Sequence, residues 1–204
     1  MAAHDVPGMA VGVTLDGRQH TFPFGVASRE SGAAVTAETL FEIGSLSKTF
    51  TATLVTLAQA LGTLSLQDSP GRALPVLRGC AIDAVTLLQL GTYTAGGLPL
   101  QFPAEIGDEA AALDFFRQWK PEARPGTQRR YSNPSVGLLG HITATSMQRS
   151  YGELAERELF PRLGLRRTFI RVPASHLDRY AWATTRRTRR SGSIRVSSTR
   201  RPTA

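Results

Sequence analysis

The sequence predicts an α+β protein, and three observations indicate this class. Two extended, partly apolar stretches flank an Asp16-Gly17 pair near the start of the chain. From Ser45 onward, apolar residues recur mainly at helical spacing. With 204 residues and 41% apolar content, the chain is long enough to bury a core. We therefore expect a two-stranded hairpin followed by a mainly helical region.

Each element follows from a local pattern. The stretches "MAVGVTL" and "RQHTFPFGVAS" are typical of strands, and Asp-Gly between them is a strong turn signal, so residues 9–28 are predicted to form a hairpin. Apolar residues spaced from Phe50 to Leu61 and a stop at Gly62 predict a helix over about residues 45–61. Further helices are predicted over residues 83–90, 108–119, 133–147 and 151–160.

Positive charge is concentrated at the C-terminal end. The formal net charge is +8, and residues 183–204 hold seven arginines and no acidic residue, which leaves 17 basic against 16 acidic residues in 1–182. This Arg-rich tail has few residues that could bury surface, so we expect it to be disordered and residues 1–182 to form the domain. A basic arm for nucleic acid is one interpretation, and a compositional accident is the other. We expect no nucleic-acid partner.

Several classes of site are excluded by composition. Cys80 is the single cysteine, which excludes an internal disulfide and a cysteine-based zinc site, and we expect it to be a small buried residue. The four histidines lack metal-ligand spacing, so no metal or cofactor is expected. No apolar run reaches the roughly 18 residues of a membrane span, and the first residues do not read as a signal peptide. The chain as printed is therefore expected to stay in the cytoplasm, away from membranes.

The stretch "FEIGSLSKTF" carries the first candidate site. If Ser45 occupies the first turn of the predicted helix, Lys48 lies one turn later on the same face, whereas Ser47 points elsewhere. A serine hydroxyl needs a base to become a nucleophile, and a desolvated lysine can serve. Backbone N–H groups at a helix start favour an oxyanion. The pair suits acyl transfer, while the alternative is a surface lysine in a chance S-x-x-K motif.

The second candidate site is in "RRYSNPS". Tyr131 and Asn133 lie two residues apart before a predicted helix and can present a phenol and an amide to the same side. The phenol could relay a proton, and the amide could hold a substrate carbonyl. The alternative is an exposed tyrosine in a turn, with Asn133 as the N-cap ahead of Pro134.

Together these residues resemble the class C β-lactamases, within the superfamily of serine β-lactamases and penicillin-binding proteins. "SLSK" matches the S-x-x-K motif, "YSN" matches Y-x-N, and "TYTAGGLPLQFP" is similar to the loop between them. The similarity runs from about Asp5 to about Tyr180. It implies a β-lactamase/transpeptidase-like fold, a monomer in the periplasm, and hydrolysis of a β-lactam through an acyl-enzyme.

The resemblance also implies a role for each matched residue. Ser45 would be the nucleophile, and Lys48 and Tyr131 would handle its proton. Asn133 and Gln101 would bind the acyl side chain of the β-lactam substrate. A D-Ala-D-Ala carboxypeptidase or an esterase of the same superfamily would keep both motifs, and a catalytically dead fragment is a third possibility.

Two departures from the family pattern bear on activity. The resemblance begins just short of the first strand and stops near Ala183, and with only Lys48 and Lys120 available no K-T-G motif can be written. "RSGS" from Arg190 mimics this motif but lies too close in sequence to Tyr131. We therefore expect a truncated fold whose C-terminal sheet strands are missing, with an open edge and an uncovered apolar face on the hairpin. The missing C-terminal segment would also remove one of the oxyanion-hole donors that the resemblance implies. This loss is expected to lower the reaction rate by about 10²–10³-fold.

The abrupt end of the resemblance predicts a frameshift near codon 183. The following residues use only a few residue types, as expected of a GC-rich coding sequence read out of frame. Sequencing of the flanking DNA should reveal family-like codons in another frame, including Lys-Thr-Gly downstream and a signal peptide upstream. If no frame encodes either, the tail is a genuine extension and the basic-arm interpretation gains support.

Overall fold

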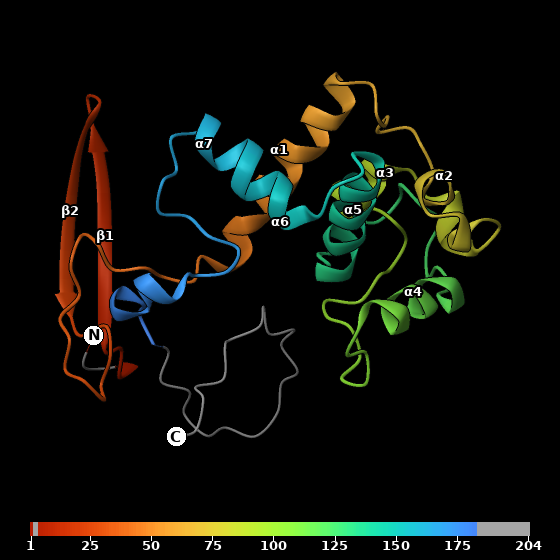
Figure 1. Ribbon diagram of the computed structural model, residues 1–204. Helices are drawn as coiled ribbons and strands as arrows, with labels where there is room; N and C mark the ends of the chain where they lie inside the picture. The colour runs from red at the N-terminus through yellow and green to blue at the C-terminus, as the bar shows by residue number, and fades with distance from the viewer. Residues whose placement is uncertain (2–3, 183–204) are drawn as a thin grey trace. The chain divides into compact units, whose positions relative to one another are not determined.

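The computed structural model describes residue 1 and residues 4–182 (Figure 1). These residues divide into two compact units, one formed by residues up to Ser45 together with residues 165–182, and the other by Leu46–Gly164. The predicted disordered tail, residues 183–204, lies outside the described residues. Among residues 4–182, no helix combines the length and the apolar character that crossing a bilayer requires.

The predicted hairpin is present in the first unit. Strand β1 (Gly8–Leu15) pairs antiparallel with β2 (Arg18–Gly25), in a register that runs from Gly8 opposite Gly25 to Leu15 opposite Arg18. The turn residues Asp16 and Gly17 have φ of 50° and 76°. Two successive positive φ angles are the signature of a type I′ turn, whose twist matches that of the strands. The Asp-Gly pair therefore sets the register, as predicted.

One face of this hairpin is apolar and exposed. Cross-strand pairs Met9–Phe24 and Val11–Phe22 lie on the same face because alternate residues of a strand point the same way. Met9, Phe22 and Phe24 remain 41%, 48% and 46% exposed. Within the described part of the chain this sheet has two strands, so the open edge and apolar face match the expectation.

The first unit also joins two distant segments. Leu40 forms a parallel β-bridge with Tyr180. The Leu40 N–H donates to the Arg179 carbonyl at 2.8 Å, and the Leu40 carbonyl accepts from the Ala181 N–H at 2.9 Å. The Tyr180 hydroxyl donates to the Glu42 carboxylate. Burial, with this bond and the neighbouring charge, raises the pKa of Tyr180 to about 12. A short helix, η6 (Ala174–Arg179), precedes Tyr180 and was not predicted.

The second unit is helical, as predicted. Helix η2 (Gly44–Leu46) leads into it from the first unit. Its longest helices are α1 (Ser47–Ala60), α4 (Glu109–Gln118) and α5 (Asn133–Ser146). Its shorter helices are α2 (Pro70–Ala73), η3 (Pro75–Leu77), η4 (Ala81–Ala84), α3 (Leu87–Gly91), α6 (Tyr151–Glu153), η5 (Leu154–Leu159) and α7 (Phe160–Arg162).

Three helix predictions need correction. The helix predicted over residues 83–90 is two helices, η4 and α3, because Thr86 begins α3 with a capping box and extended backbone. The helix predicted over 151–160 passes through a π-helical segment, η5, between α6 and α7. The helix predicted from Ser45 begins as an α-helix only at Ser47, since η2 is a 3₁₀ turn.

The core of the second unit is built around α1 and α5. Buried positions of α1 are Thr51, Leu54, Val55 and Ala58, which share one face at helical spacing. Phe50, at the edge of this face, packs edge-to-face on Phe160 with 5.0 Å between the ring centroids. Leu61, also expected on the apolar stripe, lies beyond the end of α1 and is 61% exposed. Cys80 is partly buried against this core.

Leu54 in α1 and Leu61, the residue that follows this helix, allow a matched stability test. Leu54→Ala should lower the free energy of unfolding by about 2–5 kcal/mol, because Leu54 is fully buried and its truncation leaves a cavity. Leu61→Ala should change it by no more than about 0.5 kcal/mol. Urea unfolding followed by circular dichroism measures both. Equal losses in the two variants would contradict the assignment of the buried face.

Candidate active site

The S-x-x-K residues lie where η2 meets α1. Ser45 is the middle residue of η2 and its side chain is exposed, while Lys48 is the second residue of α1 and is half-buried. The three-residue spacing thus runs across the junction of a 3₁₀ turn and an α-helix. The N-cap residue of α1 is Leu46, which makes no side-chain capping hydrogen bond. Ser47 is the first residue of α1 and is exposed.

Lys48 and Tyr131 are brought together by the fold. The Lys48 Nζ lies 5.0 Å from the centroid of the Tyr131 ring, within the range of a cation–π contact. Tyr131 is 37% exposed, so one part of the ring faces solvent while another faces the lysine. Lys48 and Tyr131, distant in sequence, therefore meet within the second unit.

Asn133 occupies the first turn of α5 rather than its cap. The N-cap is Ser132, whose hydroxyl accepts a hydrogen bond from the Ser135 N–H at 3.1 Å. The alternative interpretation is therefore wrong about the N-cap, although Tyr131 is exposed as that interpretation expected. The Asn133 Oδ1 is buried and has no hydrogen-bond partner within the described residues. A buried acceptor without a partner is costly, so this atom is suited to receive an N–H from a ligand.

Gln101 lies beside the start of α5. The Asn133 N–H donates to the carbonyl of Leu100 at 3.0 Å, which fixes the residue before Gln101 against the helix start. Gln101 itself is half-buried. The segment that carries Gln101 therefore lies next to the start of α5.

The loop before Gln101 is held by two glycines. Gly96 and Gly97 have φ of 106° and 111°, which side chains rarely adopt. The Gly96 carbonyl accepts hydrogen bonds from Glu122 at 2.8 Å and Ala123 at 3.2 Å. Arg130 donates to the Gly97 carbonyl and forms an ion pair with Glu122 at 2.7 Å. This loop is therefore fastened to the segment that leads into Tyr131.

Two residues near Tyr131 were missed by the sequence analysis. The ring of Tyr93 lies 5.0 Å from that of Tyr131, tilted by 41°, and the Arg129 guanidinium lies 5.3 Å from the Tyr93 centroid. Burial, together with the nearby Tyr131, raises the pKa of Tyr93 against the lowering effect of Arg129. Both residues lie within the part of the sequence that resembles the family. The spacing of Tyr93 and Arg129 in the sequence does not predict that their side chains meet.

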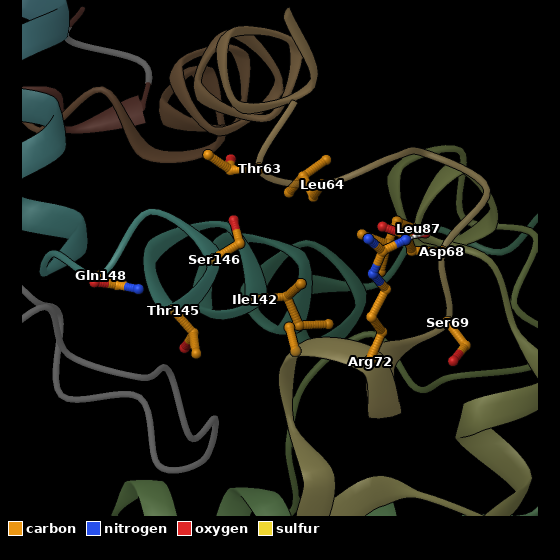
Figure 2. A pocket seen from close by; sticks show the side chains of 11 residues that line it. Thr63, Leu64, Asp68, Ser69, Arg72, Leu87, Ile142, Thr145, Ser146 and Gln148 are labelled. Carbon is orange, nitrogen blue, oxygen red and sulfur yellow. Dashed lines mark hydrogen bonds and ion pairs between the residues drawn. The ribbon is translucent and has the colours of Figure 1, made fainter. Parts of the chain in front are cut away.

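A surface hollow lies away from these residues (Figure 2). It lies near the C-terminal ends of α1 and α5, whereas Lys48 and Asn133 are at their starts. Its lining is mixed, with an Asp68–Arg72 ion pair of 2.5 Å. No predicted site residue lines it. Within the described residues, no group of three or more His, Cys, Asp and Glu side chains is placed to hold a metal ion.

A family model named Beta-lactamase matches residues 1–201. The chain belongs to the beta-lactamase family. It is 49% identical over 181 residues to a beta-lactamase of Pseudomonas fluorescens, covering 89% of this chain and 51% of that protein. A beta-lactamase of Lysobacter lactamgenus is 46% identical, again over 89% of this chain and 47% of the relative. The chain therefore spans about half the length of the curated relatives it matches.

Solved structures agree with the predicted class. A class C beta-lactamase from Rhodobacter sphaeroides superposes with a TM-score of 0.86 at 44% identity, over 95% of this chain and 56% of that one. A class C beta-lactamase in complex with cefoxitin superposes with a TM-score of 0.85 at 42% identity, over 89% of this chain and 51% of that one. A D-alanine carboxypeptidase from Burkholderia cenocepacia superposes with a TM-score of 0.84 at 43% identity, over 95% of this chain and 54% of that one. The predicted class C resemblance and β-lactamase/transpeptidase fold are confirmed.

The end of the resemblance differs between comparisons. Alignments with these two curated beta-lactamases cover 181 of the 204 residues each. The family model reaches residue 201, well into the Arg-rich tail.

The close contact of Gly96 allows a stability test of the loop before Gln101. A Cβ on Gly96 would lie 2.3 Å from the carbonyl oxygen of Ala123, and φ is unfavourable for alanine. Gly96→Ala should therefore lower the free energy of unfolding by about 1–3 kcal/mol. Gly107→Ala is the control, since its Cβ would meet nothing within 4 Å. Indistinguishable urea midpoints for the two variants would show that the loop is not held as described.

Proposed function

We propose that this chain carries the acylation residues of a serine β-lactamase. The observation that carries the proposal is the contact between Lys48 and Tyr131, with Nζ 5.0 Å from the ring centroid. Two candidate proton carriers from separate motifs meet there, and the serine of S-x-x-K precedes Lys48 by three residues. The similarity to class C beta-lactamases supports the same reaction.

The proposed reaction has two steps. The Ser45 hydroxyl attacks the β-lactam carbonyl, the ring C–N bond breaks, and the proton from Ser45 passes through Lys48 and Tyr131 to the ring nitrogen. Water then hydrolyses the resulting ester, and the same two residues move its proton. The exposed position of Ser45 on η2 suits attack on an external substrate.

Substrate binding is assigned to Asn133 and Gln101. The buried Oδ1 of Asn133, which has no partner within the described residues, accepts an N–H from the substrate's side-chain amide. Gln101 follows Leu100, which is bonded to the Asn133 backbone, so both amides serve one ligand group. We further propose a monomer that acts in the periplasm, as the resemblance implies.

A second candidate is a D-alanine carboxypeptidase. It is favoured by similar structures described as "Beta-Lactamase/D-Alanine Carboxypeptidase" from Pseudomonas syringae and as a D-alanine carboxypeptidase from Burkholderia cenocepacia. Both reactions acylate the same serine. Rates of Ser45 acylation by a cephalosporin, a D-Ala-D-Ala peptide and a short ester would separate them.

Covalent labelling tests the nucleophile directly. A fluorescent penicillin should label the chain slowly, and peptide mass spectrometry should place the adduct on Ser45. Ser45→Ala should abolish labelling, whereas the matched control Ser47→Ala should retain it because Ser47 is on the neighbouring turn. An adduct on Ser47 or Ser132 would overturn the assignment.

Steady-state turnover tests the expectation from the missing K-T-G motif. The chain as printed should hydrolyse a chromogenic cephalosporin barely above background. Turnover in the ordinary enzyme range, about 1–10³ s⁻¹, would show that this motif is dispensable here or replaced.

A further inference from the structure

Four side chains of the second unit form a continuous stack. Arg129 lies over the ring of Tyr93 at 5.3 Å, and Tyr93 lies 5.0 Å from Tyr131 between ring centroids. The Lys48 ammonium lies 5.0 Å from the centroid of the Tyr131 ring. Tyr131 therefore contacts both the ring of Tyr93 and the Lys48 ammonium. Tyr93 contacts both the ring of Tyr131 and the Arg129 guanidinium.

The backbone of Tyr93 is held in an unusual conformation. Its φ of 63° is in the left-handed region, which bulky side chains seldom adopt and which costs about 1–3 kcal/mol. Surrounding hydrogen bonds enforce it: the Tyr93 carbonyl accepts from the Arg130 N–H at 2.9 Å, and its own N–H donates to Leu90 at 3.3 Å. Glycine would adopt this conformation without strain. What the tyrosine adds is its ring, and that ring lies against Tyr131.

We propose that Tyr93 is a positioning residue that holds the Tyr131 phenol against Lys48. The proposal deepens the proposed function, on which it rests, because a proton can pass between Lys48 and Tyr131 only if the two stay in contact. Tyr131 is on an irregular segment and is partly exposed, so its own backbone does not fix its ring. Tyr93 packs against the ring of Tyr131, and the Arg129 guanidinium lies over the ring of Tyr93.

Two substitutions separate the ring from the backbone effect. Tyr93→Phe keeps the aromatic contact, so Ser45 acylation should stay close to that of the original chain. Tyr93→Gly relieves the left-handed strain but removes the ring, so acylation should fall by about 10² through misplacement of Tyr131. Gln148→Gly is the matched control, because Gln148 also has a positive φ, 55°, and lies outside the stack. It should leave acylation unchanged.

A readout independent of activity tests the contact itself. The chain has four tyrosines, so 3-fluorotyrosine labelling gives four ¹⁹F signals that single Tyr→Phe variants assign. Lys48→Met should shift the Tyr131 signal in the original chain and in Tyr93→Phe, but not in Tyr93→Gly. Such non-additivity is the mark of coupled residues. Thermal unfolding confirms that each variant is folded, and Tyr93→Leu replaces Tyr93→Gly if that variant does not fold.

The outcomes distinguish this proposal from the proposed function. An equal effect of Lys48→Met with and without the Tyr93 ring would overturn the positioning role, whatever the activity. Acylation losses that follow thermal stability alone, including in Gln148→Gly, would also overturn it. If the ¹⁹F coupling is found but no serine is ever acylated, the positioning contact stands and the β-lactamase function fails.

Discussion

The packing of α1 against α5 is the constraint on which the candidate site depends. A Cβ on Gly140 of α5 would lie 3.4 Å from Thr51 of α1, so the two helices approach closely at this point. Leu54 on α1 and Ile142 on α5 are fully buried. Lys48 is in the first turn of α1, and Tyr131 immediately precedes α5. Fixing the two helices against each other therefore also brings the backbones of these two residues close together.

The irregular segments near the site are ordered by backbone hydrogen bonds to one another. Arg130 N–H donates to Tyr93 at 2.9 Å, Gly126 to Thr94 at 2.8 Å, and Asn133 to Leu100 at 3.0 Å. These bonds pair two irregular loops, which satisfies backbone groups of both loops and limits their motion. The Ser135 hydroxyl, bonded to the Leu90 carbonyl at 2.7 Å, ties the same region to α3. Rigidity at the site comes from this network as much as from the helices.

Sequence patterns predicted the elements better than their ends. Asp16-Gly17 was sufficient for the hairpin because the turn type determines the register, and apolar spacing was sufficient for α1 because one face must be buried. The break at Thr86 was not predicted, since a capping box inside an apolar run competes with helix continuation. Ser132 and Asn133 are both good N-caps, and only the Ser132 bond to Ser135 decides between them. The left-handed φ of Tyr93 leaves no trace in composition or spacing.

The sequence motifs predict which residues belong to the candidate site, whereas the structure shows the contacts that bring Lys48 and Tyr131 together. S-x-x-K and Y-x-N specify which groups are present, but neither motif contains the reason why Lys48 and Tyr131 meet. That reason is distributed over the α1–α5 interface, two glycines with positive φ and a strained tyrosine. Ser45 is exposed on a 3₁₀ turn ahead of α1, so its local backbone geometry differs from that of Lys48, three residues later in the α-helix. In the proposed reaction, the nucleophile would be on an exposed turn, and its two proton carriers would be in the first turn of one packed helix and just before the other. This arrangement would meet two opposing demands, access for substrate and a fixed path for the proton.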